Sequence, residues 1–169
     1  MIGGKKLSGT GDARMVIKNR DLLIISCLRQ DARMKLTDMS KVTKVPVSTL
    51  FDRIKLHEGG LIKRHTALVR FDKLGYHARA LIAFSTAPKD RQKLLELLDK
   101  SRNVNSLHKI NNGWDYMAEV VFPGVKEVEE FIEGIEEQIR LKGRKVFYII
   151  DEIKRESFLS NPNTAGLVA

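Results

Sequence analysis

The spacing of apolar residues changes once along this chain, at the pair Gly59-Gly60, and this change predicts two differently built parts. Before the glycines, apolar side chains recur at helical spacing in three short segments. Asn19 is placed to cap the first segment, and Pro46 suits the first turn of the third, where its missing N–H would be unpaired in any case. Leu50, Ile54 and His57 form the expected inward stripe of that third helix.

After the glycines, strand-like stretches take over and alternate with helical ones. Leu61–Phe71 is rich in residues that favour strands and predicts a small hairpin, or wing. Asn111-Asn112-Gly113 predicts a tight turn between two strands. The remaining expected elements are strand Ala78–Phe84, helix Arg91–Leu98, strand Val104–Ile110, strand Tyr116–Phe122, helix Val125–Ile139 and strand Lys145–Ile153.

The predicted fold class is therefore α+β, with an N-terminal winged helix-turn-helix followed by a ferredoxin-like βαββαβ dimerisation domain. Both helices and the hairpin fall where this topology needs them. The expected segments are a flexible basic arm (1–17), the DNA-binding domain (18–70), a linker (71–77), the ferredoxin-like dimerisation and effector domain (78–156) and a C-terminal tail (157–169).

Charge is distributed unequally between the two parts. Residues 1–74 hold 16 Lys and Arg against 7 Asp and Glu, whereas residues 75–169 hold 14 of each, so the whole formal net charge of +9 lies in the first part. A basic part beside a neutral one predicts a polyanionic partner for the first, and double-stranded DNA is the partner we expect. An ordinary basic surface without such a partner is the alternative.

Several classes of protein do not fit the sequence. No stretch approaches 18 consecutive apolar residues, so we expect no membrane partner, and no signal-peptide pattern opens the chain. Cys27 is the single cysteine and lies in an apolar run, which predicts a core thiol in a protein of the reducing cytoplasm. The four histidines have no metal-ligand spacing, and no phosphate loop or nucleophile motif is present. We therefore expect no catalytic residue, no metal, no cofactor and no enzyme activity.

The two helices before Gly59 and the turn between them predict a helix-turn-helix, whose second helix enters the major groove. With Leu50 and Ile54 turned inward, the outward residues are candidates for DNA contact. The full predicted DNA-binding set is Lys44, Ser48, Thr49, Asp52, Arg53, Lys55, Lys63, Arg64 and His65. Arg53 is suited to a guanine or a phosphate. The alternatives are that Arg53 forms an ion pair with Asp52 or Asp21, and that residues 63–65 are a solvated strand edge.

Several segments in the expected order resemble the Lrp/AsnC family of leucine-responsive transcriptional regulators. They are Asp31-Ala-Arg-Met, Asp38-Met-Ser-Lys, Val47-Ser-Thr-Leu-Phe-Asp-Arg-Ile-Lys, Gly60-Leu-Ile-Lys, Phe71-Asp-Lys-Leu-Gly75 and Asn112-Gly-Trp-Asp-Tyr-Met-Ala-Glu-Val. The resemblance covers about residues 18–156. It implies operator binding by a homodimer formed through the α/β part, and in this family such dimers often assemble into tetramers or octamers. It also implies an amino acid as a candidate effector.

The chain departs from the family pattern at several positions. Lys44 stands where a turn glycine is usual, Pro46 replaces a serine cap, and the stretch from Arg53 to Ile62 is one residue short. The candidate effector-binding residues that the resemblance implies are Asn112, Gly113, Trp114 and Asp115. Asp115 is suited to a ligand ammonium group, and the alternative is that it caps its own turn.

The sequence thus predicts a sequence-specific DNA-binding transcriptional regulator that acts as a dimer or higher oligomer, with a small molecule such as an amino acid as candidate modulator. Two alternatives remain open. One is an enzyme similar to the sirohaem decarboxylases, which share this architecture but carry Trp-Pro-Tyr where this chain has Trp114-Asp115-Tyr116. The other is a DNA-organising protein of low sequence preference.

Overall fold

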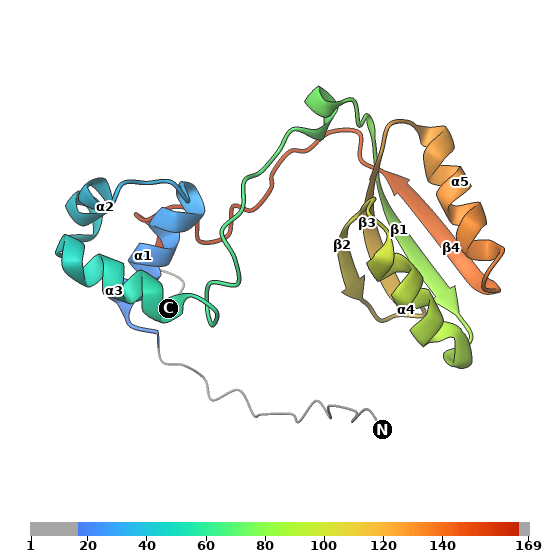
Figure 1. Cartoon of the computed structure of the whole chain (residues 1–169), viewed down its shortest axis with the longest axis horizontal. Helices are drawn as coiled ribbons and strands as arrows, with labels where there is room; N and C mark the ends of the chain where they lie inside the picture. Colours follow the sequence, from blue (N-terminus) through green and yellow to red (C-terminus); the bar gives the residue numbers. More distant parts are fainter. Residues whose placement is uncertain (1–16, 166–169) are drawn as a thin grey trace, which may run out of the picture. The chain divides into compact units, whose positions relative to one another are not determined.

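The computed structural model describes residues 17–165, and these form two compact units (Figure 1). A helical unit comprises residues 17–67 together with 154–165, and a sheet unit comprises residues 68–153. The basic arm expected over residues 1–17 lies outside the described residues, apart from Ile17. Among the described helices, none has the length and apolar character needed to cross a membrane.

Three helices build the helical unit, as the sequence predicted: α1 (Asn19–Gln30), α2 (Leu36–Thr43) and α3 (Val47–His57). Their common core is small and consists of Ile24, Cys27, Met39, Val45 and Leu50. Cys27 is fully buried, which confirms the predicted core thiol, and burial raises the pKa of its thiol. The expectation that Asn19 caps α1 is wrong. Lys18 occupies the cap position and its side chain makes no capping bond, so Asn19 is already helical.

The described end of the chain, residues 154–165, belongs to the helical unit, and Arg29 near the end of α1 holds it. The Arg29 Nε donates to the carbonyl of Phe158 at 2.5 Å. Its Nη2 donates to the carbonyl of Glu156 at 3.1 Å and to Glu156 Oε2 at 2.9 Å. A planar guanidinium presents several fixed donors, so one side chain can satisfy three acceptors of a segment without regular structure.

The sheet unit follows the predicted βαββαβ order, and its α+β, ferredoxin-like topology is confirmed. Its elements are β1 (Ala78–Thr86), α4 (Arg91–Lys100), β2 (Val104–Lys109), β3 (Tyr116–Phe122), α5 (Val125–Glu136) and β4 (Leu141–Tyr148). Short 3-10 helices cover Phe71–Leu74 and Pro88–Asp90. All neighbouring strands are antiparallel, in the order β2-β3-β1-β4.

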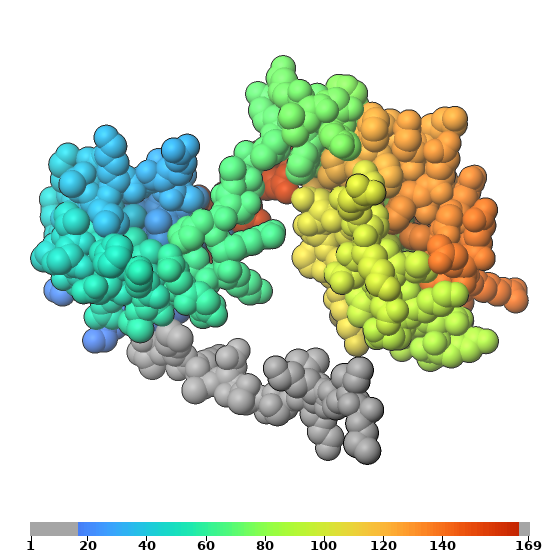
Figure 2. Space-filling model, viewed as in Figure 1, coloured from blue at the N-terminus to red at the C-terminus, as the bar shows by residue number. Residues whose placement is uncertain are grey.

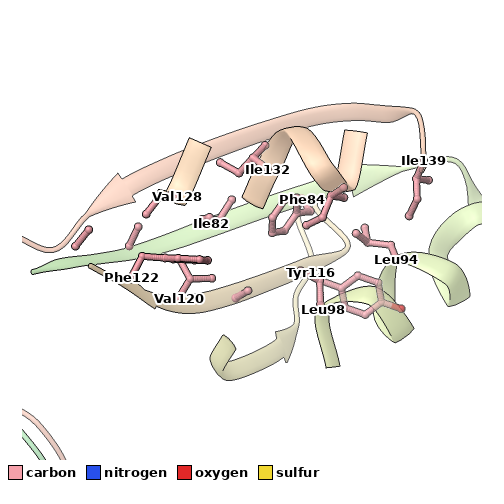
Figure 3. Close-up of a cluster of buried hydrophobic side chains, with 14 residues drawn as sticks. Ile82, Phe84, Leu94, Leu98, Tyr116, Val120, Phe122, Val128, Ile132 and Ile139 are labelled. Carbon is pink, nitrogen blue, oxygen red and sulfur yellow. The ribbon is translucent and has the colours of Figure 1, made fainter. Parts of the chain in front are cut away.

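The main core of the sheet unit lies between one face of the sheet and the helices α4 and α5 (Figure 3). Alternate residues of each strand point to this face because side chains alternate along a strand. Ile82 and Phe84 of β1, Val120 of β3 and Ile132 of α5 are fully buried there. The opposite face carries the intervening residues, and neither helix packs on it. Its apolar members are Leu81, Ala83, Met117, Val121 and Phe147.

The last strand is shifted from its predicted position. We expected Lys145–Ile153, whereas β4 spans Leu141–Tyr148 and pairs with β1 from Thr86 to Ala80. The charged start of β4 argued against a strand in the sequence, but Arg144 reaches Glu129 and Glu136 of α5 at 3.1 and 3.4 Å. The strand-favouring Ile150 has no partner strand and is 93% exposed.

Candidate nucleic-acid interface

Helices α2 and α3 are joined by a short turn, residues 44–46, that sets the start of α3. Lys44 ends α2 with a φ of 58°, the left-handed conformation that usually favours glycine. Ser40 Oγ donates to the carbonyl of Val45 at 2.6 Å, and Thr43 Oγ1 accepts from the Val45 N–H at 3.3 Å. Pro46 then occupies the N-cap position of α3. These bonds fix the helix-turn-helix geometry that the sequence predicted.

The third helix presents its predicted outward residues to solvent. Leu50 and His57 are buried and Ile54 is half-buried, so one side of α3 packs on α1 and α2. The expected contact residues Ser48, Thr49, Asp52 and Lys55 are all exposed. In the space-filling view, α3 lies on the surface of the helical unit and no other described element covers it (Figure 2).

Arg53 has a protein partner, as one of the alternatives foresaw. Its Nη1 lies 3.4 Å from Oδ2 of Asp21, which is buried on α1, and the Arg53 side chain is 36% exposed. The buried ring of His57 places its Nε2 3.6 Å from Asp21 Oδ1. Asp21 therefore pairs with Arg53 of α3 and lies beside the His57 ring. The Arg53 side chain is therefore paired within the unit and still partly open to solvent.

The predicted wing is not formed. The stretch after α3 contains only an isolated bridge between Glu58 and Ile62, and residues 63–70 have no strand partner. A strand needs a neighbour for its backbone hydrogen bonds, and the chain leaves the helical unit after residue 67 before a second strand forms. The predicted contact residues Lys63, Arg64 and His65 are nevertheless exposed, with His65 Nε2 3.5 Å from Glu58 Oε1.

The candidate effector-binding residues lie on the turn between β2 and β3. Asn112 and Gly113 both have positive φ, 59° and 87°, as the Asn-Gly hairpin signal predicts. The Trp114 ring packs against β4, since a Cβ at Gly143 would lie 3.7 Å from it. The buried Asp115 is not used to cap its own turn. Its Oδ2 accepts from the Thr86 N–H at 2.8 Å, and its Oδ1 pairs with Arg91 Nε at 2.6 Å.

The comparisons with known proteins agree with this arrangement. No family model matches the chain. An uncharacterised HTH-type transcriptional regulator of Pyrococcus horikoshii is 30% identical over 126 residues, which cover 74% of this chain and 78% of the relative. The chain belongs to the Lrp/AsnC family of helix-turn-helix transcriptional regulators. The resemblance predicted from the sequence is thereby confirmed.

Solved structures of Lrp/AsnC regulators share the fold. An AsnC family transcriptional regulator from Agrobacterium tumefaciens superposes with a TM-score of 0.73 at 20% identity, covering 82% of this chain and 94% of that one. LrpC of Bacillus subtilis gives 0.74 at 22%, covering 83% and 99%. A transcriptional regulator of Neisseria meningitidis in complex with L-Met gives 0.74 at 19%, covering 82% and 93%.

Two features of this Lrp/AsnC regulator were not predicted from its sequence. Phe51 on α3 is 51% exposed, although apolar residues of an amphipathic helix are usually assigned to the core. Its position could have been predicted from the spacing, since Phe51 lies one turn after Val47 and about a quarter-turn around the helix from the inward Leu50–His57 stripe. The ion pair between Arg29 and Glu156 could not be predicted from sequence spacing, because the two residues are 127 positions apart.

Proposed function

We propose that this DNA-binding transcriptional regulator recognises a specific duplex sequence by placing α3 in the major groove. The observation that supports this most directly is the uncovered side of α3, where Ser48, Asp52 and Lys55 are exposed on the part of the chain that holds all of its net positive charge. In helix-turn-helix proteins, residues near the start of the second helix contact base edges. Ser48 and Thr49 occupy that position, within the first turn of α3.

The basic residues around α3 are proposed to contact phosphates, which position a protein on the duplex without reading its sequence. Lys44 in the turn, Lys55 on α3 and residues 63–65 after it are exposed and suited to this role. Arg53 has two proposed roles. One is a guanine or phosphate contact, which its 36% side-chain exposure supports, and the other is its pairing with Asp21, which connects α3 to α1.

A second copy of the chain is the proposed partner of the open sheet face. Leu81, Met117, Val121 and Phe147 share this face, and neither helix of the sheet unit packs on it. Phe147 on this face is 45% exposed. An apolar face that no helix covers favours association, and two-fold dimers are the commonest assemblies. A dimer also presents two copies of α3 to two half-sites. Tetramers or octamers would extend this dimer.

An amino acid is the proposed effector, with Asn112, Gly113, Trp114 and Asp115 as candidate contacts. The related regulator of Neisseria meningitidis bound to L-Met supports this class of ligand. The carboxylate of Asp115 already pairs with Arg91, so a ligand ammonium group would have to compete with or replace that guanidinium. The relatives described above are regulators, which favours a regulatory function over the sirohaem decarboxylase alternative.

One experiment tests these proposals together. Duplexes bound by the full chain are selected from a random pool, with and without the common amino acids, at fixed salt concentration. We expect enrichment of a two-fold symmetric site, and a change in affinity with one or a few amino acids. Strong binding without sequence preference would favour the DNA-organising alternative, and absence of duplex binding would refute the proposal.

The role of Arg53 is tested with the selected duplex. Arg53→Ala is expected to weaken binding by about 1–3 kcal/mol if the side chain reads a base. Unchanged affinity with a lower melting temperature would instead assign Arg53 to the Asp21 pair alone. Light scattering of the full chain measures the dimer, and Phe147→Asp on the open sheet face is expected to yield a monomer.

A further inference from the structure

The uncovered side of α3 carries apolar as well as polar side chains. Val47 is 40% exposed and Phe51 is 51% exposed. They lie four residues apart, so they are neighbours on one stripe of the helix. Neither belongs to the core cluster of the helical unit. A single exposed apolar residue is ordinary, but these two fall within the first two turns of the helix that is proposed to enter the major groove.

The stripe continues one turn further with a positive charge. Lys55 follows Phe51 by four residues, and its Nζ lies 5.2 Å from the centroid of the Phe51 ring. A cation at this distance is attracted to the face of the ring. Along α3 the surface therefore runs from two apolar side chains near the helix start to an ammonium group near its end.

The base edges of the major groove offer few groups to such a surface. Phenylalanine and valine have no hydrogen-bonding group, so they cannot read the donors and acceptors that distinguish most bases. The one large apolar group on these edges is the C5-methyl of thymine, and apolar side chains contact it in protein–DNA complexes. A protein partner is a weaker candidate for this stripe because it lies on the basic part of the chain and beside Lys55.

We propose that Phe51, with Val47 beside it, contacts thymine methyl groups in the major groove, while Lys55 binds a neighbouring phosphate. The inference rests on the proposed binding of duplex DNA through α3. It adds that each half-site carries at least one thymine whose methyl group is recognised, and that Phe51 is a specificity-determining residue.

Replacement of thymine by deoxyuridine is the test, because it removes the methyl group and leaves base pairing and the hydrogen-bonding edges unchanged. The duplex selected by the full chain is synthesised with single thymines replaced in turn, and affinities are measured at fixed salt concentration. Burying one methyl or methylene group corresponds to about a fourfold change in affinity. We expect a loss of about this size at the thymine that Phe51 contacts, and none at thymines outside the contacted positions.

Three variants show whether Phe51 is responsible. Phe51→Ala should bind the thymine and deoxyuridine duplexes equally at that position, whereas Phe51→Leu should keep part of the preference. Leu56→Ala is the matched control, since Leu56 is 68% exposed on the last turn of α3 and should leave the methyl effect intact. Melting curves of each variant confirm folding, which we expect to be preserved because these side chains lie outside the core.

The outcomes separate the two proposals. If the chain selects a sequence but no deoxyuridine replacement weakens binding, or if Phe51→Ala keeps the full loss, the methyl contact is refuted and specific DNA binding stands. If the chain binds no duplex, the proposed function fails and this inference fails with it. A loss that disappears only in Phe51→Ala and diminishes in Phe51→Leu supports the contact.

Discussion

The helical unit and the sheet unit of this regulator are stabilised by different means. The sheet unit has a main core of 14 buried residues between its sheet and two helices, whereas the core of the helical unit has five. The helical unit adds polar connections that cross long stretches of sequence: Asp21 joins α1 to α3, and Arg29 holds the segment around Glu156. A unit with little apolar core depends more on each such connection.

The reason for this difference lies in the proposed work of α3. The helices of the helical unit have 12, 8 and 11 residues, and isolated helices of such lengths are marginal in water, so they depend on packing. One side of α3 must stay uncovered to meet DNA, which removes it from the core. The sheet unit has no such demand on the helix side of its sheet, where 14 buried residues form the main core.

The largest expected effect comes from Leu50→Ala. Leu50 is fully buried in the five-residue core, and such a truncation costs about 2–5 kcal/mol. We expect the helical unit to unfold and DNA binding to be lost, while the sheet unit stays folded. The buried Cys27 is the single cysteine and reports this directly through its reaction rate with a thiol reagent.

Ile132→Ala is the matched control, because it removes a fully buried side chain of similar size from the sheet unit. Cys27 should react no faster in this variant than in the unaltered chain. If Cys27 reacts equally slowly in Leu50→Ala and in the unaltered chain, the small core of the helical unit does not make it more sensitive to truncation.

A smaller effect is expected from Arg29→Ala. The change removes three hydrogen bonds to Phe158 and Glu156, and we expect the helical unit to lose about 1–2 kcal/mol, since the guanidinium is partly open to solvent. Trypsin cleavage after Lys154 or Arg155 should accelerate. Arg33→Ala, at an exposed position beyond α1, is the control. Unchanged cleavage in Arg29→Ala would mean that Arg29 does not hold the segment.

The smallest expected effect comes from Lys44→Gly, and it is a gain in stability. Lys44 has a left-handed backbone, which costs a residue with a side chain about 1 kcal/mol relative to glycine. The variant should therefore melt at a higher temperature. It should also bind DNA with a salt dependence lower by about one phosphate contact, if Lys44 contacts the backbone.

Lys44→Asn separates the two effects, because asparagine tolerates the left-handed conformation and carries no charge. It should lose the same phosphate contact with a smaller gain in stability. If Lys44→Gly is no more stable than the unaltered chain, the backbone conformation of Lys44 does not lower the stability of the helical unit.

Periodic features of the sequence were predictable, and partnerships across the chain were not. The apolar stripe of α5 and the Asn112-Gly113 turn are local patterns, and the structure contains both. The predicted bounds of β4 were wrong because a charged residue such as Arg144 favours a loop when its partners on α5 are unknown. The prediction of a wing was wrong because residues 61–71 favour a strand but have no neighbouring strand with which to pair.

The candidate site shows the same division. Exposure of Ser48, Asp52 and Lys55 followed from the helical period, which also placed Leu50 inward. Phe51 was missed because hydrophobicity alone suggested burial. The partner of Arg53 was among the alternatives, but a choice between Asp52 and Asp21 requires the packing of α1 against α3.

The return of residues 154–165 to the helical unit makes that unit discontinuous, with the whole sheet unit inserted between its two pieces. A chain is synthesised from its N-terminus, and domains commonly fold in that order. Here the three helices are made before the sheet unit, but the acceptors for Arg29 on Glu156 and Phe158 are made after it. The part of the regulator proposed to meet DNA is therefore completed only after the entire inserted unit has been synthesised.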